Sequence, residues 1–181
     1  MKTRTDIIEE IIFIEGGYSA NPYDSGGKTA YGITEEVARA WGYNGPMDQL
    51  PKDVAREIYT HRYWNTLSLQ NIYVYSEKWA YELFEQGVNC GVHRAGTHLQ
   101  VCLNILNNKQ EYYSDIAEDG YVGNATLLSL QKFYAIRGAE GTEVLLKMLN
   151  SLQGAFYIDL AARREKDETF IFGWFSHRVE F

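Results

Sequence analysis

The sequence predicts a mainly helical chain of the α+β class, in which a helical bundle carries one small β-hairpin near its N-terminus. Apolar residues recur at helical spacing in several separate segments, whereas one early stretch, residues 18–33, is rich in turn-forming residues and tyrosine. With 181 residues, 45% hydrophobic and 14% aromatic, the chain can fold around a core without disulfides or metals.

The first predicted helix ends at the residue most important for function. Asp6 suits its N-cap and Glu9 the third position of a capping box. An apolar stripe at helical spacing then ends at Glu15. Gly16 and Gly17 stop the helix, because glycine readily adopts the left-handed conformation that terminates helices. The stripe consists of Ile7, Ile8, Ile11 and Ile12.

The segment after this helix predicts the hairpin, because turn formers lie between Tyr18 and Ile33. Thr34 suits the N-cap of a second helix that continues to about Trp41, and Pro51 suits the first turn of a third. Later apolar periodicity and caps predict helices near residues 79–88, 99–106, 124–133 and 140–166.

Charge and hydropathy exclude several functions. Lys and Arg number 17 against 24 Asp and Glu, and the net charge of −7 argues against a nucleic acid partner. The apolar run 11–14 is too short for stable membrane insertion, and residues 1–6 lead into no signal-peptide core. We therefore expect synthesis in the cytoplasm, where Cys90 and Cys102 stay reduced.

Two carboxylates and a hydroxyl form the candidate catalytic group. An acid catalyst needs surroundings that disfavour its charged form, and the isoleucine stripe supplies them for Glu15. Asp24 lies nine residues further on, where a hairpin folding back would place it across a sugar from Glu15. Thr29 offers a hydroxyl to orient a water. Each also has an ordinary structural explanation, as a helix-end glutamate, a turn aspartate and a strand threonine.

Several segments resemble the signature of glycoside hydrolase family 108, which comprises phage endolysins and bacterial secretion muramidases. Two later segments fit the same family, so the catalytic resemblance covers about residues 1–91. The matching segments are Glu15-Gly16-Gly17-Tyr18, Asn21-Pro22-Tyr23-Asp24, Gly26-Gly27-Lys28-Thr29, Tyr31-Gly32-Ile33-Thr34, residues 58–64 and residues 84–91.

Residues 92–181 resemble the helical peptidoglycan-binding region that usually follows in this family. The resemblance rests on Leu99-Gln100, on the run from Asp119 to Thr126, and on Phe172-Gly173-Trp174-Phe175. The usual proline of the Gly-Pro-x-Thr turn is Asn124 here, and Tyr121 replaces a small aliphatic residue.

The resemblance implies a lysozyme-like fold and cleavage of the bond between N-acetylmuramic acid and N-acetylglucosamine in bacterial peptidoglycan. It implies that Glu15 is the acid, and the spacing to Asp24 and Thr29 is similar to the Glu, Asp, Thr triad of phage-type lysozymes, with one residue fewer between the last two. We expect a monomer made in the cytoplasm, the host cytoplasm if phage-encoded. Because no signal sequence is evident, it would reach the cell wall or periplasm through a holin, export machinery or delivery in a particle. Expected substrate-binding residues are Gly16, Gly17, Tyr18, Tyr31 and Asn89.

Three alternatives were weighed. A zinc site would draw on Cys90, His93, His98 and Cys102, but their spacing matches no standard zinc motif, so we expect no metal and no cofactor. A lytic transglycosylase would need one glutamate alone, and Asp24 and Thr29 argue against it. A non-catalytic peptidoglycan-binding or phage structural module would retain the fold without the chemistry, and the intact segment 15–18 argues against it.

Overall fold

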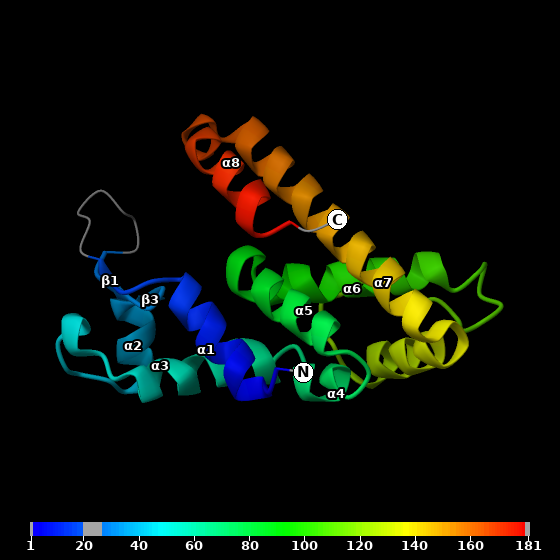
Figure 1. Cartoon of the computed structure of the whole chain (residues 1–181), viewed down its shortest axis with the longest axis horizontal. Helices are drawn as coiled ribbons and strands as arrows, with labels where there is room; N and C mark the ends of the chain where they lie inside the picture. The colour runs from blue at the N-terminus through cyan, green and yellow to red at the C-terminus, as the bar shows by residue number, and fades with distance from the viewer. Residues whose placement is uncertain (1, 20–26, 180–181) are drawn as a thin grey trace. The chain divides into compact units, whose positions relative to one another are not determined.

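The structure is a computed structural model that describes residues 2–19 and 27–179. It confirms the predicted class, because the described residues are mostly helical and carry a single small antiparallel sheet close to the N-terminus (Figure 1). Two compact units form, Met1–Asn65 and Thr66–Phe181. The sequence predicts a boundary at residues 91/92 between a catalytic region and a peptidoglycan-binding region, whereas the compact units divide after Asn65. The boundary between the two functional regions stays a prediction.

The first helix of the first unit, α1 (Arg4–Ile14), buries the isoleucine stripe, whose four side chains are at most 1% exposed. The predicted cap was wrong by one turn. Thr3 is the N-cap: its hydroxyl accepts from the Asp6 N–H at 3.2 Å, and the Asp6 carboxylate accepts from the Thr3 N–H at 2.7 Å. In this capping box the backbone N–H groups of Thr3 and Asp6 both find side-chain acceptors. The sequence predicted the same arrangement one turn later, with Asp6 and Glu9 as the pair.

The sheet consists of β1 (Tyr18–Ser19), β2 (Thr29–Ala30) and β3 (Ile33–Thr34), paired antiparallel in that order. Two residues, Tyr31 and Gly32, join β2 to β3, with φ of 53° and 70°. Positive φ at both central positions is the geometry of a tight hairpin turn that matches the strand twist. The third strand was not predicted from the sequence.

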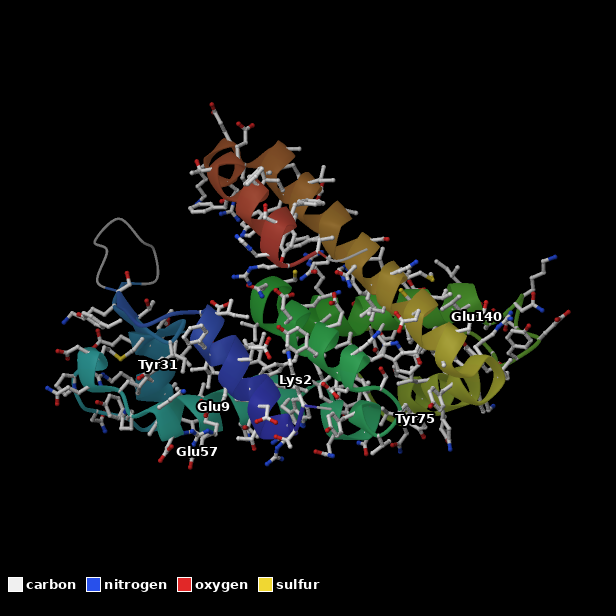
Figure 2. The ribbon with its side chains drawn as sticks, viewed as in Figure 1. Lys2, Glu9, Tyr31, Glu57, Tyr75 and Glu140 are labelled. Carbon is white, nitrogen blue, oxygen red and sulfur yellow. The ribbon has the colours of Figure 1, made fainter. Side chains whose placement is uncertain are left out.

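The rest of the first unit is helical. Thr34 caps α2 (Glu35–Trp41) by accepting from the Val37 N–H at 3.3 Å, as predicted. Pro51 lies directly before α3 rather than in its first turn. Glu9 of α1, labelled in Figure 2, forms ion pairs with Lys52 and Arg56 of α3. The remaining elements are η1 (Met47–Gln49), α3 (Lys52–Tyr59) and the π-helix η2 (Thr60–Asn65).

The second unit is entirely helical in its described residues. Its centre is α5, which packs against α4, α6 and α7, while α8 packs against α7. The long α7 changes direction at Gly138, which has the non-helical angles φ 53° and ψ −137°. The break falls between the two helices predicted near residues 124–133 and 140–166, so α7 consists of two helices that meet at Gly138. The elements are α4 (Leu69–Tyr73), α5 (Glu77–Cys90), α6 (Val92–Leu106), α7 (Asn124–Arg163), η3 (Glu165–Asp167) and α8 (Glu168–His177).

Aromatic side chains fill the core of this unit. Trp79 is fully buried, and its indole N–H donates to the Thr142 carbonyl oxygen at 2.9 Å. Its ring contacts those of Phe133 and Tyr134, and Tyr134 in turn contacts Tyr75, which Figure 2 labels. Within the described ranges, no helix is both long enough and apolar enough to cross a bilayer.

Candidate active site

Glu15 lies at the C-terminal end of α1, where it is the C-cap. Its backbone N–H donates to the Ile11 carbonyl oxygen at 2.9 Å, so the last helical turn holds the residue in place. Gly16 follows with φ of 85° and turns the chain away, as predicted. The buried stripe thus anchors a half-buried carboxylate at the edge of the first unit.

The turn between β2 and β3 packs directly against Glu15. A Cβ atom added to Gly32 would lie 3.1 Å from the Glu15 Cβ, 3.2 Å from its Oε2 and 3.0 Å from the Tyr59 hydroxyl. A side chain at this position would push its neighbours aside by a few tenths of an ångström. The Tyr59 hydroxyl donates to the Tyr31 carbonyl oxygen at 2.9 Å, which fixes the turn to α3. The carboxylate therefore has a hairpin on one side and a tyrosine beside it.

Tyr63 adds a second phenol near the acid. Burial raises the pKa of Tyr63, nearby Arg62 lowers it, and the negative charge of Glu15 raises it. The phenol consequently stays protonated and can donate at neutral pH. Its ring centroid lies 5.4 Å from that of Tyr59. The π-helix η2 carries Tyr63 and follows α3 without a break, so both rings are held by continuous helical backbone.

The other predicted residues of the first unit lie in the same hairpin region. The Tyr31 N–H donates to the Gly17 carbonyl oxygen at 3.3 Å, tying the turn to the segment that follows Glu15. Tyr18 lies on β1 and is 47% exposed, and Thr29 on β2 pairs with Ser19 and Thr34. Asp24 lies outside the described residues.

Asn89 belongs to the second unit, on the last turn of α5. Its amide donates to the carbonyl oxygen and to Oε1 of Glu85, at 2.9 and 2.7 Å. The Glu85 carboxylate, only 7% exposed, also accepts from Gln153 and from Arg178. This buried carboxylate joins α5, α7 and the chain after α8, and it holds the Asn89 amide in the network.

The segment from Asp119 to Thr126, which carries the resemblance in the second unit, is held by hydrogen bonds to the buried Gln100. Gln100 donates to Asp119 Oδ1 at 2.9 Å and to the Tyr121 carbonyl oxygen at 3.1 Å, and it accepts from the Gly120 N–H at 2.7 Å. A buried amide with all these partners fixes the loop before α7. Tyr121 itself is 73% exposed. The Asp119-Gly120 pair therefore has a structural role, because its hydrogen bonds with Gln100 hold this loop against α6.

The candidate metal ligands lie in buried or helical positions. Burial raises the pKa of the Cys90 and Cys102 thiols to about 12, so both are protonated at neutral pH. Across the described ranges, no group of three or more His, Cys, Asp or Glu side chains is arranged to hold a metal.

Two family models match separate parts of the chain. The model of glycosyl hydrolase family 108 matches residues 8–91, and that of a predicted peptidoglycan domain matches residues 95–179. The first match supports a glycoside hydrolase, and the second supports peptidoglycan as its substrate.

A solved structure, that of Brucella abortus SagA, is similar to this chain. The TM-score is 0.70, with 24% sequence identity over 95% of this chain and 87% of the SagA chain. Likeness at this identity shows a common fold, and it confirms the lysozyme-like architecture that the resemblance implied. No curated protein sequence matches the chain.

Three residues near Glu15 were not predicted as site residues, namely Gly32, Tyr59 and Tyr63. Gly32 lies against the Glu15 side chain and the Tyr59 hydroxyl, and the charge of Glu15 acts on the Tyr63 phenol. The Tyr31-Gly32 pair between β-forming residues was a usable signal, because a two-residue hairpin turn favours glycine. Nothing local predicted that this turn would meet the end of α1.

Proposed function

We propose that the protein is an N-acetylmuramidase that hydrolyses the β-1,4 bond between N-acetylmuramic acid and N-acetylglucosamine, with Glu15 as the general acid. The observation that carries the proposal is the placement of Glu15 within residues 8–91, the segment that matches the model of glycosyl hydrolase family 108. Its carboxylate is half-buried, fixed at the end of a helix and packed against a hairpin turn. Glycoside hydrolysis requires such a positioned acid next to the scissile bond.

In the proposed mechanism Glu15 donates its proton to the leaving glycosidic oxygen. Asp24 stabilises the positive charge that develops on the sugar ring, and Thr29 holds the attacking water. Gly16, Gly17, Tyr18, Tyr31 and Asn89 are proposed to contact the glycan. Tyr18 supports this role for the hairpin because an exposed aromatic ring offers a face on which a sugar can stack.

The test is release of reducing ends from purified peptidoglycan, with mass spectrometry of the fragments. The wild-type protein should produce muramic acid at new reducing ends, and Glu15→Gln should produce none, because glutamine cannot donate the proton. Glu36→Gln is the matched control, since Glu36 is an exposed residue of α2 in the same unit. It should keep full activity.

Other products would replace the proposal. Anhydro-muramic ends from the wild-type protein would show a lytic transglycosylase. No cleavage by wild type, combined with retained binding to the wall, would show a non-catalytic binding module. Asp24→Asn, tested in the same assay, should lower turnover while leaving wall binding unchanged.

A further inference from the structure

A hollow of about 340 Å³ lies at the start of α6, entirely within the second unit. None of its lining residues is among the predicted catalytic or substrate-binding residues. Gly91 forms the connection from α5 to α6 with φ of 90°, a conformation that favours glycine. The lining residues are Cys90, Gly91, His93, Arg94, Thr97 and His98.

The first turn of α6, which contributes His93 and Arg94 to the lining, begins without a cap. No side chain of the described residues caps its first turn, and the first intrahelical bond is donated by the Ala95 N–H to the Gly91 carbonyl oxygen at 3.1 Å. The N–H groups of Val92, His93 and Arg94 are therefore left without intrahelical acceptors. In a helix of 15 residues these groups carry a partial positive charge that favours an anion.

His98 supplies an independent sign of a ligand. Its side chain lines the hollow although the residue is only 9% exposed. Its Nδ1 lies 2.8 Å from Gln86 Oε1. The Gln86 amide nitrogen donates to Glu82 and to the Leu149 carbonyl oxygen, so its oxygen is the acceptor and His98 Nδ1 carries the hydrogen. Nε2 then bears a lone pair, and none of the described residues bonds to it.

The histidine is neutral in this position. Burial, aided by the charge of Arg94, lowers the pKa of His98 to about 4. At neutral pH its Nε2 therefore accepts a hydrogen bond rather than donating one. The hollow thus offers an acceptor on a nearly buried ring together with donors at the helix start.

Arg94 adds the positive charge. Its guanidinium carbon lies 4.0 Å from the centroid of the Phe156 ring, and stacking of this kind holds the planar group in place. The Cys90 thiol stays protonated and adds no negative charge. The buried carboxylate of Glu85, on the preceding helix, already accepts from Asn89, Gln153 and Arg178.

We propose that this hollow binds a free carboxylate that stands beside an amide N–H, the pair of groups carried by the stem peptides of peptidoglycan. The carboxylate binds at the first turn of α6 and at Arg94, and the amide N–H donates to His98 Nε2. This inference rests on the proposed function for the choice of peptidoglycan. It assigns peptide recognition to the second unit.

The test uses N-acetyl-D-alanyl-D-alanine and its C-terminal carboxamide as probes, titrated into the full-length protein with ¹⁵N-labelled histidine. The acid should bind and shift the His98 Nε2 resonance. The carboxamide should bind about tenfold more weakly or worse, because it lacks the charge. Arg94→Gln should weaken binding of the acid by a similar factor and reduce the difference between the two probes.

Two control variants separate the contacts. Lys132→Gln removes the same charge from an exposed position of α7 outside the hollow, and it should leave both affinities unchanged. His98→Gln should weaken both probes by the same factor, since both carry the amide N–H. If this variant does not fold, the comparison of the two probes on wild type and Arg94→Gln still decides the question.

Equal binding of the acid and the carboxamide, or full binding by Arg94→Gln, would overturn the proposal. So would the absence of binding to wild type. Failure here is distinguishable from failure of the proposed function, because glycan cleavage is measured separately. If the protein cleaves glycan but binds neither probe, the muramidase function stands and the peptide site is wrong. If it binds the acid but cleaves no glycan, the peptide site stands and the muramidase function is wrong.

Discussion

Replacing Gly32 with alanine tests whether the hairpin turn positions Glu15. Gly32 has φ of 70°, and alanine in the left-handed region costs about 1–2 kcal/mol. Its new Cβ would also lie 3.1 Å from the Glu15 Cβ and 3.2 Å from Oε2, so the carboxylate must move by a few tenths of an ångström. Because a misplacement of about 1 Å can cost roughly 100-fold in rate, we expect a loss of about tenfold or more in kcat.

The assay is reducing-end release from peptidoglycan. Thermal unfolding of each variant is measured in parallel, to verify that the protein is folded at the assay temperature. Gly42→Ala is the matched control: Gly42 has φ of 102°, and a Cβ there would meet nothing within 4 Å. Both variants should lose similar stability, and only Gly32→Ala should lose turnover. Full turnover in Gly32→Ala, or an equal loss in both, would refute the claim that the turn holds the acid in place.

Two further predictions concern the second unit. Gly96→Ala should lower the free energy of unfolding by about 3 kcal/mol or more, because its Cβ would lie 2.1 Å from the Gly120 carbonyl oxygen; a denaturant midpoint equal to wild type would contradict this contact. The pKa of His98 falls from its ordinary 6.5 to about 4 on folding, so the unfolded chain binds more protons between these values. The contribution of His98 to the free energy of unfolding should therefore be complete above about pH 6.5 and decline as the pH falls toward 4. In urea unfolding measured across this range, His98→Gln should reduce the dependence of stability on pH. An unchanged pH dependence in the variant would show that another group titrates.

Local pattern was sufficient to predict the helix that carries the acid. The isoleucines of α1 recur at the helical period, and all four are buried. Gly16 adopts the left-handed conformation that ends the helix, and Thr34 caps α2. These outcomes depend on side chains only a few residues apart, so a sequence window contains the whole cause.

The cap of α1 shows where such reasoning fails. Asp6 and Thr3 each qualify as an N-cap by residue type. Thr3 is the cap because Asp6 at the third helical position returns a bond to the Thr3 N–H, and together they form the box. Several starting points were chemically acceptable, and the reciprocal geometry decided among them.

The polar partners in the second unit were also hidden from the sequence. Asn89 was predicted to bind substrate, and that role stays a proposal, but its amide is held by Glu85. The Glu85 carboxylate meets Gln153 and Arg178, which are 68 and 93 residues away. Burial of a carboxylate requires such partners, and only packing of α5 against α7 supplies them.

Local sequence pattern predicted most of the helices, the turn-rich hairpin and the glutamate at the end of the apolar stripe, but it did not predict α4 or α8. The successes follow because hydrophobic periodicity and glycine conformation act over one or two helical turns. Long-range packing, which no sequence window contains, brings Gly32 against Glu15, ties the Tyr59 hydroxyl to the hairpin turn and joins His98 Nδ1 to Gln86. These contacts join residues 12 to 28 positions apart, and their distances depend on how whole elements pack, which no local pattern encodes.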